Sequence, residues 1–270
     1  MSEQPDPHHL PEHVRTNRVA WDAWAADYVG PAERCWASEE PSWGVFSVPE
    51  SELHVLPERL DGLDAIELGC GAAYVSAWLA RRGARVVGID NSERQLDTAR
   101  RLQAEHGLSF PLLHGNAETV PYPDRSFDLA ISEYGVCLWA DPARWVPEAA
   151  RLLRPGGRLV FLTTSQLLAL CAPDQEGQPA TDRLVRSCAQ ARRLAFPDPP
   201  SVEFHRSPGE WLRLLADSGL QLEELTDVYA PEGSTTHYRF VTPDWARCWP
   251  CEAVYKASKP ATAGPPQRGR

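Results

Sequence analysis

Residues 64–73, with the sequence DAIELGCGAA, decide the fold of this chain. The stretch 64–68 is apolar and has the length of a buried strand, and Gly69 and Gly71 follow it at a turn. Residues 72–82 predict a helix, which Gly83 ends. A strand, a glycine turn and a helix in this order are typical of the start of a βαβ unit.

The same alternation continues along the chain. Strands are expected at 85–89, 110–113, 127–132 and 158–163, and two late strands at 221–229 and 252–257. Helices are expected at 92–106, at 147–153 with Pro147 in the first turn, and after the capping box that begins at Ser207. The pattern predicts an α/β, Rossmann-like fold whose seven-stranded sheet is mostly parallel and carries helices on both faces.

The remaining segments interrupt this alternation. Trp21, Trp24 and Tyr28 lie on one face of an expected helix over 18–28, and the Trp-rich stretch 33–50 is expected to be irregular. We divide the chain into an N-terminal helical and aromatic lid segment (1–60), a cofactor-binding core (61–164), an inserted cap (165–206), a C-terminal part of the core sheet (207–258) and a loose tail (259–270). Residues 1–13 are also expected to be loose.

Composition excludes several classes of function. The formal net charge of −10 argues against a nucleic-acid partner, because phosphate contacts need clustered Lys and Arg. The first residues contain no apolar stretch typical of a signal peptide, and the longest apolar run is too short for a membrane span, so we expect neither. Its seven scattered cysteines suit a reducing cytosol, so we expect a cytoplasmic protein without a membrane partner. Cys248 and Cys251 form a CxxC pair that lacks a second pair, and we expect no metal site there.

The glycine turn and the acids beside it point to a nucleoside-containing ligand. The helix that follows Gly71 directs its free N–H groups toward any carboxylate bound at the turn. Asp90, at the end of the second strand, can accept hydrogen bonds from ribose hydroxyls. A dinucleotide would require a third small residue where Tyr74 stands, and Glu67 would repel a pyrophosphate but attract an ammonium group. The charges therefore favour S-adenosylmethionine (SAM) over NAD.

From here the sequence resembles the class I SAM-dependent methyltransferases, in particular the small-molecule branch that includes ubiquinone and menaquinone methylases. The resemblance covers residues 61–163. It is carried by four motifs in the family's order, which are ELGCG (67–71), VVGID with SERQL (86–96), GNAETVPYPDRSFD (115–128) and ARLLRPGGRLVF (150–161). Ala73 departs from the pattern, because many relatives have a third glycine there.

The resemblance implies roles for individual residues. The methionine part of SAM would lie at the turn after Glu67, the ribose on Asp90, and the adenine against residues 116–118, while Ser132 and Glu133 would face the sulfonium or the acceptor. The expected cofactor-binding residues are Glu67, Gly69, Cys70, Gly71, Asp90, Asn91, Gln95, Asn116, Ala117, Glu118 and Ser132. For several of them a structural role remains open: the glycines and Asn116 as turn residues, Asp90 as a helix cap, and Cys70 as a small filler.

The expected reaction is methyl transfer to a small-molecule acceptor by in-line displacement, in which positioning supplies most of the catalysis. Candidate general bases are Glu133, His205 and His237, each with a surface or packing role as the alternative. An aromatic acceptor pocket is expected between the N-terminal segment and residues 165–204. Its expected lining is Trp36, Trp43, Phe46, Tyr134 and Trp139, which could instead pack the lid on the sheet. An NAD(P)-dependent oxidoreductase and a non-catalytic SAM-binding protein remain the alternative functions.

Overall fold

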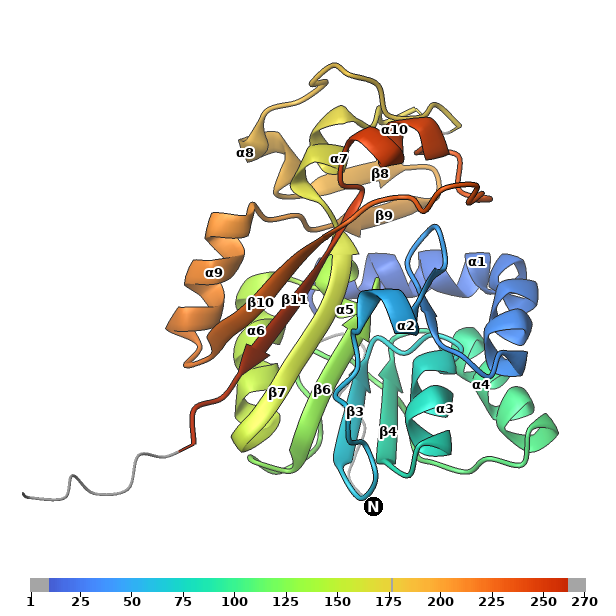
Figure 1. Cartoon of the computed structure of the whole chain (residues 1–270), viewed down its shortest axis with the longest axis vertical. Coiled ribbons are helices and arrows are strands. Elements are labelled where there is room, and N and C mark those ends of the chain that lie inside the picture. The colour runs from blue at the N-terminus through green and yellow to red at the C-terminus, as the bar shows by residue number, and fades with distance from the viewer. Residues whose placement is uncertain (1–9, 176, 262–270) are drawn as a thin grey trace, which may run out of the picture.

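The computed structural model describes residues 10–175 and 177–261. Its centre is a seven-stranded sheet in the order β10-β11-β7-β6-β3-β4-β5 (Figure 1). The strands from β7 to β5 are parallel, and β11 runs antiparallel to both of its neighbours. The bounds are Asp64–Leu68 (β3), Arg85–Asp90 (β4), Leu112–His114 (β5), Phe127–Glu133 (β6), Leu153–Thr164 (β7), Gln221–Val228 (β10) and Glu252–Ser258 (β11). The predicted fold class is confirmed.

Helices cover both faces of this sheet. One face packs against α1 (Glu12–Ala37), α3 (Tyr74–Arg81) and α4 (Glu93–Glu105), and the other against α6 (Pro142–Leu152) and α9 (Pro208–Asp217). Successive strand residues alternate between the two cores, so that Ala65 belongs to the first and Ile66 to the second. From β3 the chain adds β4 and β5 toward one edge of the sheet, and from β6 it adds β7 toward the other edge. The strand order therefore reverses between β3 and β6, which is the topological switch point.

Two segments lie beyond the carboxyl ends of the parallel strands. Residues 166–203 form α7 (Gln166–Cys171), α8 (Cys188–Ala191) and the β8–β9 hairpin (Leu194–Pro197 and Pro200–Glu203), which Figure 1 shows above the upper end of the sheet together with α10 (Pro243–Cys248). Nearer to α3, the short strands β1 (Ser42–Trp43) and β2 (Val48–Pro49) form a second hairpin, which leads into α2 (Glu50–Leu53). A further short helix, α5 (Val136–Trp139), follows β6 after two residues.

The N-terminal helix is longer than predicted. The expected bounds 18–28 are too short, and the expectation of irregular structure over 33–50 is wrong for its first and central parts, because α1 continues to Ala37 and β1 pairs with β2. The helix contains Pro31 and continues past it. Beyond Pro31, Ala32 and Trp36 lie one helical turn apart and are both buried in the core. Tertiary packing thus outweighs the helix-breaking tendency of proline.

The prediction that Pro147 stands in the first turn of a helix is also wrong. Helix α6 begins at Pro142, and the Asp141 side chain caps it by accepting a hydrogen bond from the Ala143 N–H. Asp141-Pro142 is itself an N-cap followed by an N1 proline, a start signal five residues before the proposed one. Pro147 therefore stands at an exposed position in the interior of the helix, next to Trp145 and Val146, which are fully buried.

The structure adds three facts on the remaining expectations. Lys259, which the prediction assigned to the loose tail, donates hydrogen bonds from its side chain to the carbonyls of Ala150 and Leu153. The rest of the expected loose ends, residues 1–9 and 262–270, lies outside the described residues. All seven cysteines are free thiols. Within the described ranges, no helix combines the length and apolar character that a membrane span requires.

Candidate active site

Asp90 stands at the carboxyl end of β4 and connects two neighbouring turns. One of its carboxylate oxygens accepts a hydrogen bond from the Gly71 N–H (2.7 Å), and the other accepts one from the Ser92 N–H (2.7 Å). The first bond fixes the glycine turn after β3, and the second fixes the first turn of α4. Burial raises the pKa of Asp90, and the two N–H groups oppose that shift. A carboxylate has about four acceptor positions, so ribose hydroxyls can still donate to it.

The glycine turn lies against a second turn at the switch point. Gly69 has a positive φ of 72°, and a Cβ on it would lie 2.7 Å from both Gly135 Cα and Val136 N. Conversely, a Cβ on Gly135 would lie 2.4 Å from the Gly69 carbonyl oxygen. The two turns therefore pack backbone on backbone, which only glycine permits. Gly69 has a structural role here in addition to any contact with a ligand.

The other residues of the glycine turn, Cys70 and Gly71, are less tightly enclosed by backbone than Gly69. Gly71 also has a positive φ (52°), but its nearest neighbour is the Gln95 side chain, 3.9 Å from an added Cβ. The Cys70 side chain points inward against Gly88, and burial raises the pKa of its thiol well above the ordinary value. This position agrees with a filler role for Cys70. Ala73, where relatives have glycine, adopts a left-handed φ of 60° and delays the start of the helix to Tyr74.

Glu67 is buried on the α3 face of the sheet. Its Oε2 accepts hydrogen bonds from the N–H (2.7 Å) and the hydroxyl (2.5 Å) of Ser76 in α3. The pKa of Glu67 is raised to about 8, chiefly by burial and to a smaller degree by the charges of Glu133 and Asp90, while the hydrogen bonds from Ser76 oppose the shift. A buried carboxylate without a cation is unfavourable, so a bound ammonium group would stabilise its ionised form.

The expected adenine side is built from residues after β5. Asn116 accepts a hydrogen bond from the Glu118 N–H with its own side chain, as an Asx turn does, and Ala117 is buried. Glu118 Oε1 accepts from the Asp141 N–H (2.8 Å) and lies 2.5 Å from His13 Nε2, while its buried Oε2 has no partner among the described residues. The Asn116 side chain thus supports the turn itself, and its role toward adenine stays a prediction.

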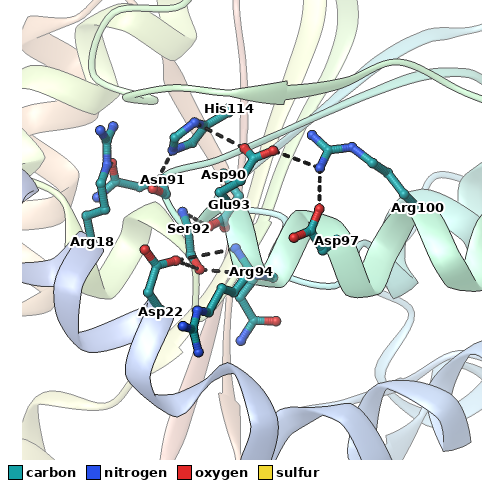
Figure 2. A network of polar contacts seen from close by, with 11 residues as sticks. Arg18, Asp22, Asp90, Asn91, Ser92, Glu93, Arg94, Asp97, Arg100 and His114 are labelled. Atoms are coloured by element: carbon teal, nitrogen blue, oxygen red, sulfur yellow. Dashed lines mark hydrogen bonds and ion pairs between the residues drawn. The ribbon is translucent and has the colours of Figure 1, made fainter. Parts of the chain in front are cut away.

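Helix α1 contacts both the residues that follow Asp90 and those on the expected adenine side. Asn91 accepts a hydrogen bond from Arg18 and donates one to the Val14 carbonyl. Ser92 donates to Asp22, as Figure 2 shows. Figure 2 also shows that the network extends through Glu93 to His114 and Arg100. Because His13 contacts Glu118, α1 spans the expected ribose and adenine positions together.

The same helix reaches the inserted segment. The buried Asn17 donates hydrogen bonds to the carbonyls of Trp139 and Val202 and accepts one from the Val202 N–H, each at 2.8 Å. One side chain therefore joins α1 to α5 and to strand β9. Helix α1 and strand β9 therefore contact each other above the carboxyl edge of the sheet.

The structure separates the three candidate bases. Glu133 ends β6 with its carboxylate accepting hydrogen bonds from the Gly44 N–H (2.7 Å) and the Tyr74 hydroxyl (2.5 Å), and burial raises its pKa. His205 is buried at the end of the hairpin and lies 3.0 Å from Glu203. The His237 ring lies against Tyr238, and partial burial lowers the pKa of His237. Of the three, Glu133 lies near Glu67, because its charge raises the pKa of Glu67.

The five aromatic candidates also occupy different places. Trp36 contacts His106 and Phe110 and is completely buried, so its position gives no support to a role in acceptor binding. Trp43 packs on Trp78, and Phe46 is buried nearby. Tyr134 and Trp139, which follow β6, are partly exposed. The Trp139 ring lies 5.2 Å from Trp21 and 5.8 Å from Trp24, between α1 and α5.

Several residues at this edge were not anticipated. Gly135 and the α1 residues His13, Asn17 and Arg18 carry no local signal, because their partners are distant in the sequence. Glu252 could have been found: it begins the last strand, and an antiparallel strand places its first residue at the carboxyl edge of its parallel neighbours.

The comparisons with known proteins agree with this geometry. A family model described as "Methyltransferase domain" matches residues 66–161. The chain is 34% identical over 186 residues to the ubiquinone biosynthesis O-methyltransferase of Maricaulis maris, and the match covers 67% of this chain and 71% of that protein. The chain belongs to the class I SAM-dependent methyltransferases.

Two further comparisons extend this result. The solved structure of an S-adenosylmethionine dependent methyltransferase from Mesorhizobium loti superposes with a TM-score of 0.59 at 26% identity, covering 77% of this chain and 95% of that one. The chain is also 33% identical over 178 residues to an uncharacterized methyltransferase of Mycobacterium bovis, a match that covers 61% of this chain. The chain spans 44% to 66% of the length of several curated relatives that it matches.

Replacing Gly69 tests the contact between the two turns. Gly69→Ala forces a methyl group against Gly135 and Val136 and strains a positive φ, and we expect the free energy of unfolding to fall by about 3 kcal/mol or more. Gly62→Ala is the matched control, because Gly62 has a similar φ of 76° but nothing within 4 Å of an added Cβ. It should cost about 1–2 kcal/mol. Urea unfolding measures both variants, and equal losses would contradict the close packing.

The pH dependence of stability tests the burial of Glu67. Its pKa is about 8 in the folded chain and near 4.5 when exposed, so its contribution is present below about pH 4.5 and is lost as the pH rises toward 8. Glu67→Gln should therefore flatten the fall in unfolding free energy between about pH 5 and pH 8, whereas Glu224→Gln, at an exposed position, should not. Parallel slopes for Glu67→Gln and the unmodified chain would show that Glu67 ionises normally.

Proposed function

We propose that the protein transfers a methyl group from SAM to a small-molecule acceptor. The observation that carries this proposal is the arrangement at the switch point: the buried Glu67, the glycine turn at 69–71 and Asp90 lie at one edge of the sheet and join through the Asp90–Gly71 hydrogen bond. This set combines an acid for an ammonium group, a helix N-terminus for a carboxylate and an acid for ribose hydroxyls. Glu67 would repel a pyrophosphate, and Tyr74 stands where a dinucleotide site has a third small residue, which disfavours an oxidoreductase.

Each residue would have a distinct task in holding the cofactor. Glu67 would bind the ammonium group, and its raised pKa would fall to the ordinary range as the cation binds. The N–H groups at the start of α3 would bind the carboxylate, and Asp90 would hold the ribose while it keeps the turn in place. When bound, SAM supplies a methyl group on a positively charged sulfur, an already activated donor. The chain then has to orient the acceptor and exclude water.

The acceptor is proposed to be small because the segments above the sheet enclose the site. Helix α1 bonds to Asn91, Ser92 and Glu118 on one side, and through Asn17 to the cap on the other. Between them lies a cluster of partly exposed rings with centroids 5.0–5.8 Å apart. Its members are Trp21, Trp24, Tyr28 and Trp139. Such a cluster suits a flat or apolar molecule better than a polymer.

Calorimetric titration with SAM, S-adenosylhomocysteine and NADH tests this proposal. We expect micromolar binding of the first two ligands and none of NADH. Asp90→Ala should weaken binding at least about tenfold, because it removes the ribose acceptor and loosens the Gly71 turn. Asp97→Ala is the matched control, since Asp97 is an exposed acid on α4 that contacts only Arg100 among the hydrogen bonds of the described residues. NADH binding in place of SAM would refute the proposal.

A further inference from the structure

Three glutamates lie on the α3 face of the sheet at its carboxyl edge. Glu67 pairs in register with Ile131, two residues before Glu133, and Glu133 pairs with Leu162, two residues before Thr164. Glu252 pairs with Thr164. The three acids therefore step diagonally across the sheet, from the expected methionine position toward β11. Glu133 and Glu252 lie at the end of this line that is farther from Asp90.

The carboxylates of Glu133 and Glu252 bind two adjacent residues of the β1–β2 hairpin. Glu133 Oε1 accepts the Gly44 N–H at 2.7 Å, and Glu252 Oε1 accepts the N–H of Val45 at 3.0 Å. A Cβ on Gly44 would lie only 2.3 Å from the same Glu252 oxygen. Gly44 is thus enclosed between the two acids. Glu133 is partly buried, and Glu252 is completely inaccessible.

No cation balances this pair among the residues that the structure describes. The donors to Glu133 are the Gly44 N–H and the Tyr74 hydroxyl, and those to Glu252 are the Val45 N–H and the Cys251 thiol. All four are neutral. Burial raises the pKa of both carboxyl groups, that of Glu252 to about 7, and Glu133 adds to the shift at Glu252. Two buried acids with only neutral partners are an incomplete electrostatic arrangement.

The Tyr134 hydroxyl is a further polar group at this pair. Its buried oxygen lies beside the Glu252 carboxylate and the Thr164 side chain, but neither contact reaches full hydrogen-bond geometry among the described residues. A buried hydroxyl without a partner is unusual in a folded protein. A donor that reached Glu252 from the site would also reach this oxygen. The Tyr74 hydroxyl donates to Glu133, and the charges of Glu133 and Glu252 raise the pKa of Tyr238, so both tyrosines lie near the two acids.

We propose that Glu133 and Glu252 bind a positively charged nitrogen of the acceptor, so that the acceptor is an organic amine or ammonium compound. This inference rests on the proposed function and names the substrate class of the same site. An ammonium group supplies the absent positive charge and N–H donors for both carboxylates and for Tyr134.

Cation binding at this pair is coupled to proton release. Glu252, with its pKa raised to about 7, is partly protonated at neutral pH, and a bound cation lowers the pKa of a neighbouring carboxyl group. The titratable groups that face the pair come from every surrounding element, and none of them is a cation. They are Cys35 of α1, Glu67 of β3, Tyr74 of α3, Tyr134 after β6, Tyr238 before α10 and Cys251 before β11.

The test compares amines with alcohols of the same shape. Three pairs are titrated calorimetrically into protein saturated with S-adenosylhomocysteine at about pH 7, where the amines are charged: phenethylamine and 2-phenylethanol, tryptamine and tryptophol, hexylamine and hexanol. We expect at least one amine to bind about tenfold or more tightly than its alcohol. Its binding heat should differ between phosphate and Tris buffers in the sense of proton release. Glu252→Gln should abolish both effects, and the exposed Glu224→Gln should leave both intact.

The outcomes separate this inference from the proposed function. Loss of S-adenosylhomocysteine binding by the unmodified protein would count against the function itself. If that ligand binds but no amine exceeds its alcohol, the amine inference is wrong and the function stands. If Glu252→Gln instead weakens SAM relative to S-adenosylhomocysteine, the pair serves the sulfonium and the inference is again wrong. Unchanged S-adenosylhomocysteine affinity in Glu252→Gln also shows that the variant is folded.

Discussion

The Asp90 carboxylate is the constraint on which the rest of the site depends. By accepting the Gly71 and Ser92 N–H groups it ties the end of β4 to the turn after β3 and to the start of α4. The turn after β3 also packs, through Gly69, on Gly135, which follows β6 on the other side of the switch point. The positions of three consecutive strand ends are thus linked through one side chain and one glycine contact. Helix α1 contacts Asn91 and Ser92, the two residues that follow Asp90 in the chain.

Buried acids are the second theme of this edge. Glu67, Glu133 and Glu252 share one face of the sheet, and burial raises the pKa of each. An arrangement of this kind weakens the chain on its own and favours cationic ligands, because each bound cation removes part of the desolvation cost of a neighbouring carboxylate. An ammonium beside Glu67 and a basic nitrogen beside Glu133 and Glu252 would meet this condition at opposite ends of the line. The site is therefore formed as much by unbalanced charge as by shape.

The sequence predicted those parts of the molecule that local signals determine. The strand, glycine turn and helix at 64–82, the acid that ends β4 and the capping box at Ser207 all have short-range patterns, and each lies where it was expected. Features set by distant packing could not be predicted in this way. Helix α1 continues through Pro31 because Trp36 is buried in the core, and Gly69 needs its glycine partner from another turn. The bases and the acceptor lining proposed from the sequence remain predictions, and Glu252 entered the site only when the direction of β11 was known.

The structure of the protein in complex with S-adenosylhomocysteine tests the central claim most directly. We expect the ribose hydroxyls within hydrogen-bonding distance of Asp90, the amino group beside Glu67, and the adenine next to Ala117 beneath α1. The bond from Gly71 to Asp90 should persist in the complex. A ligand bound elsewhere, or one at the switch point that leaves Asp90 without a contact, would contradict the account.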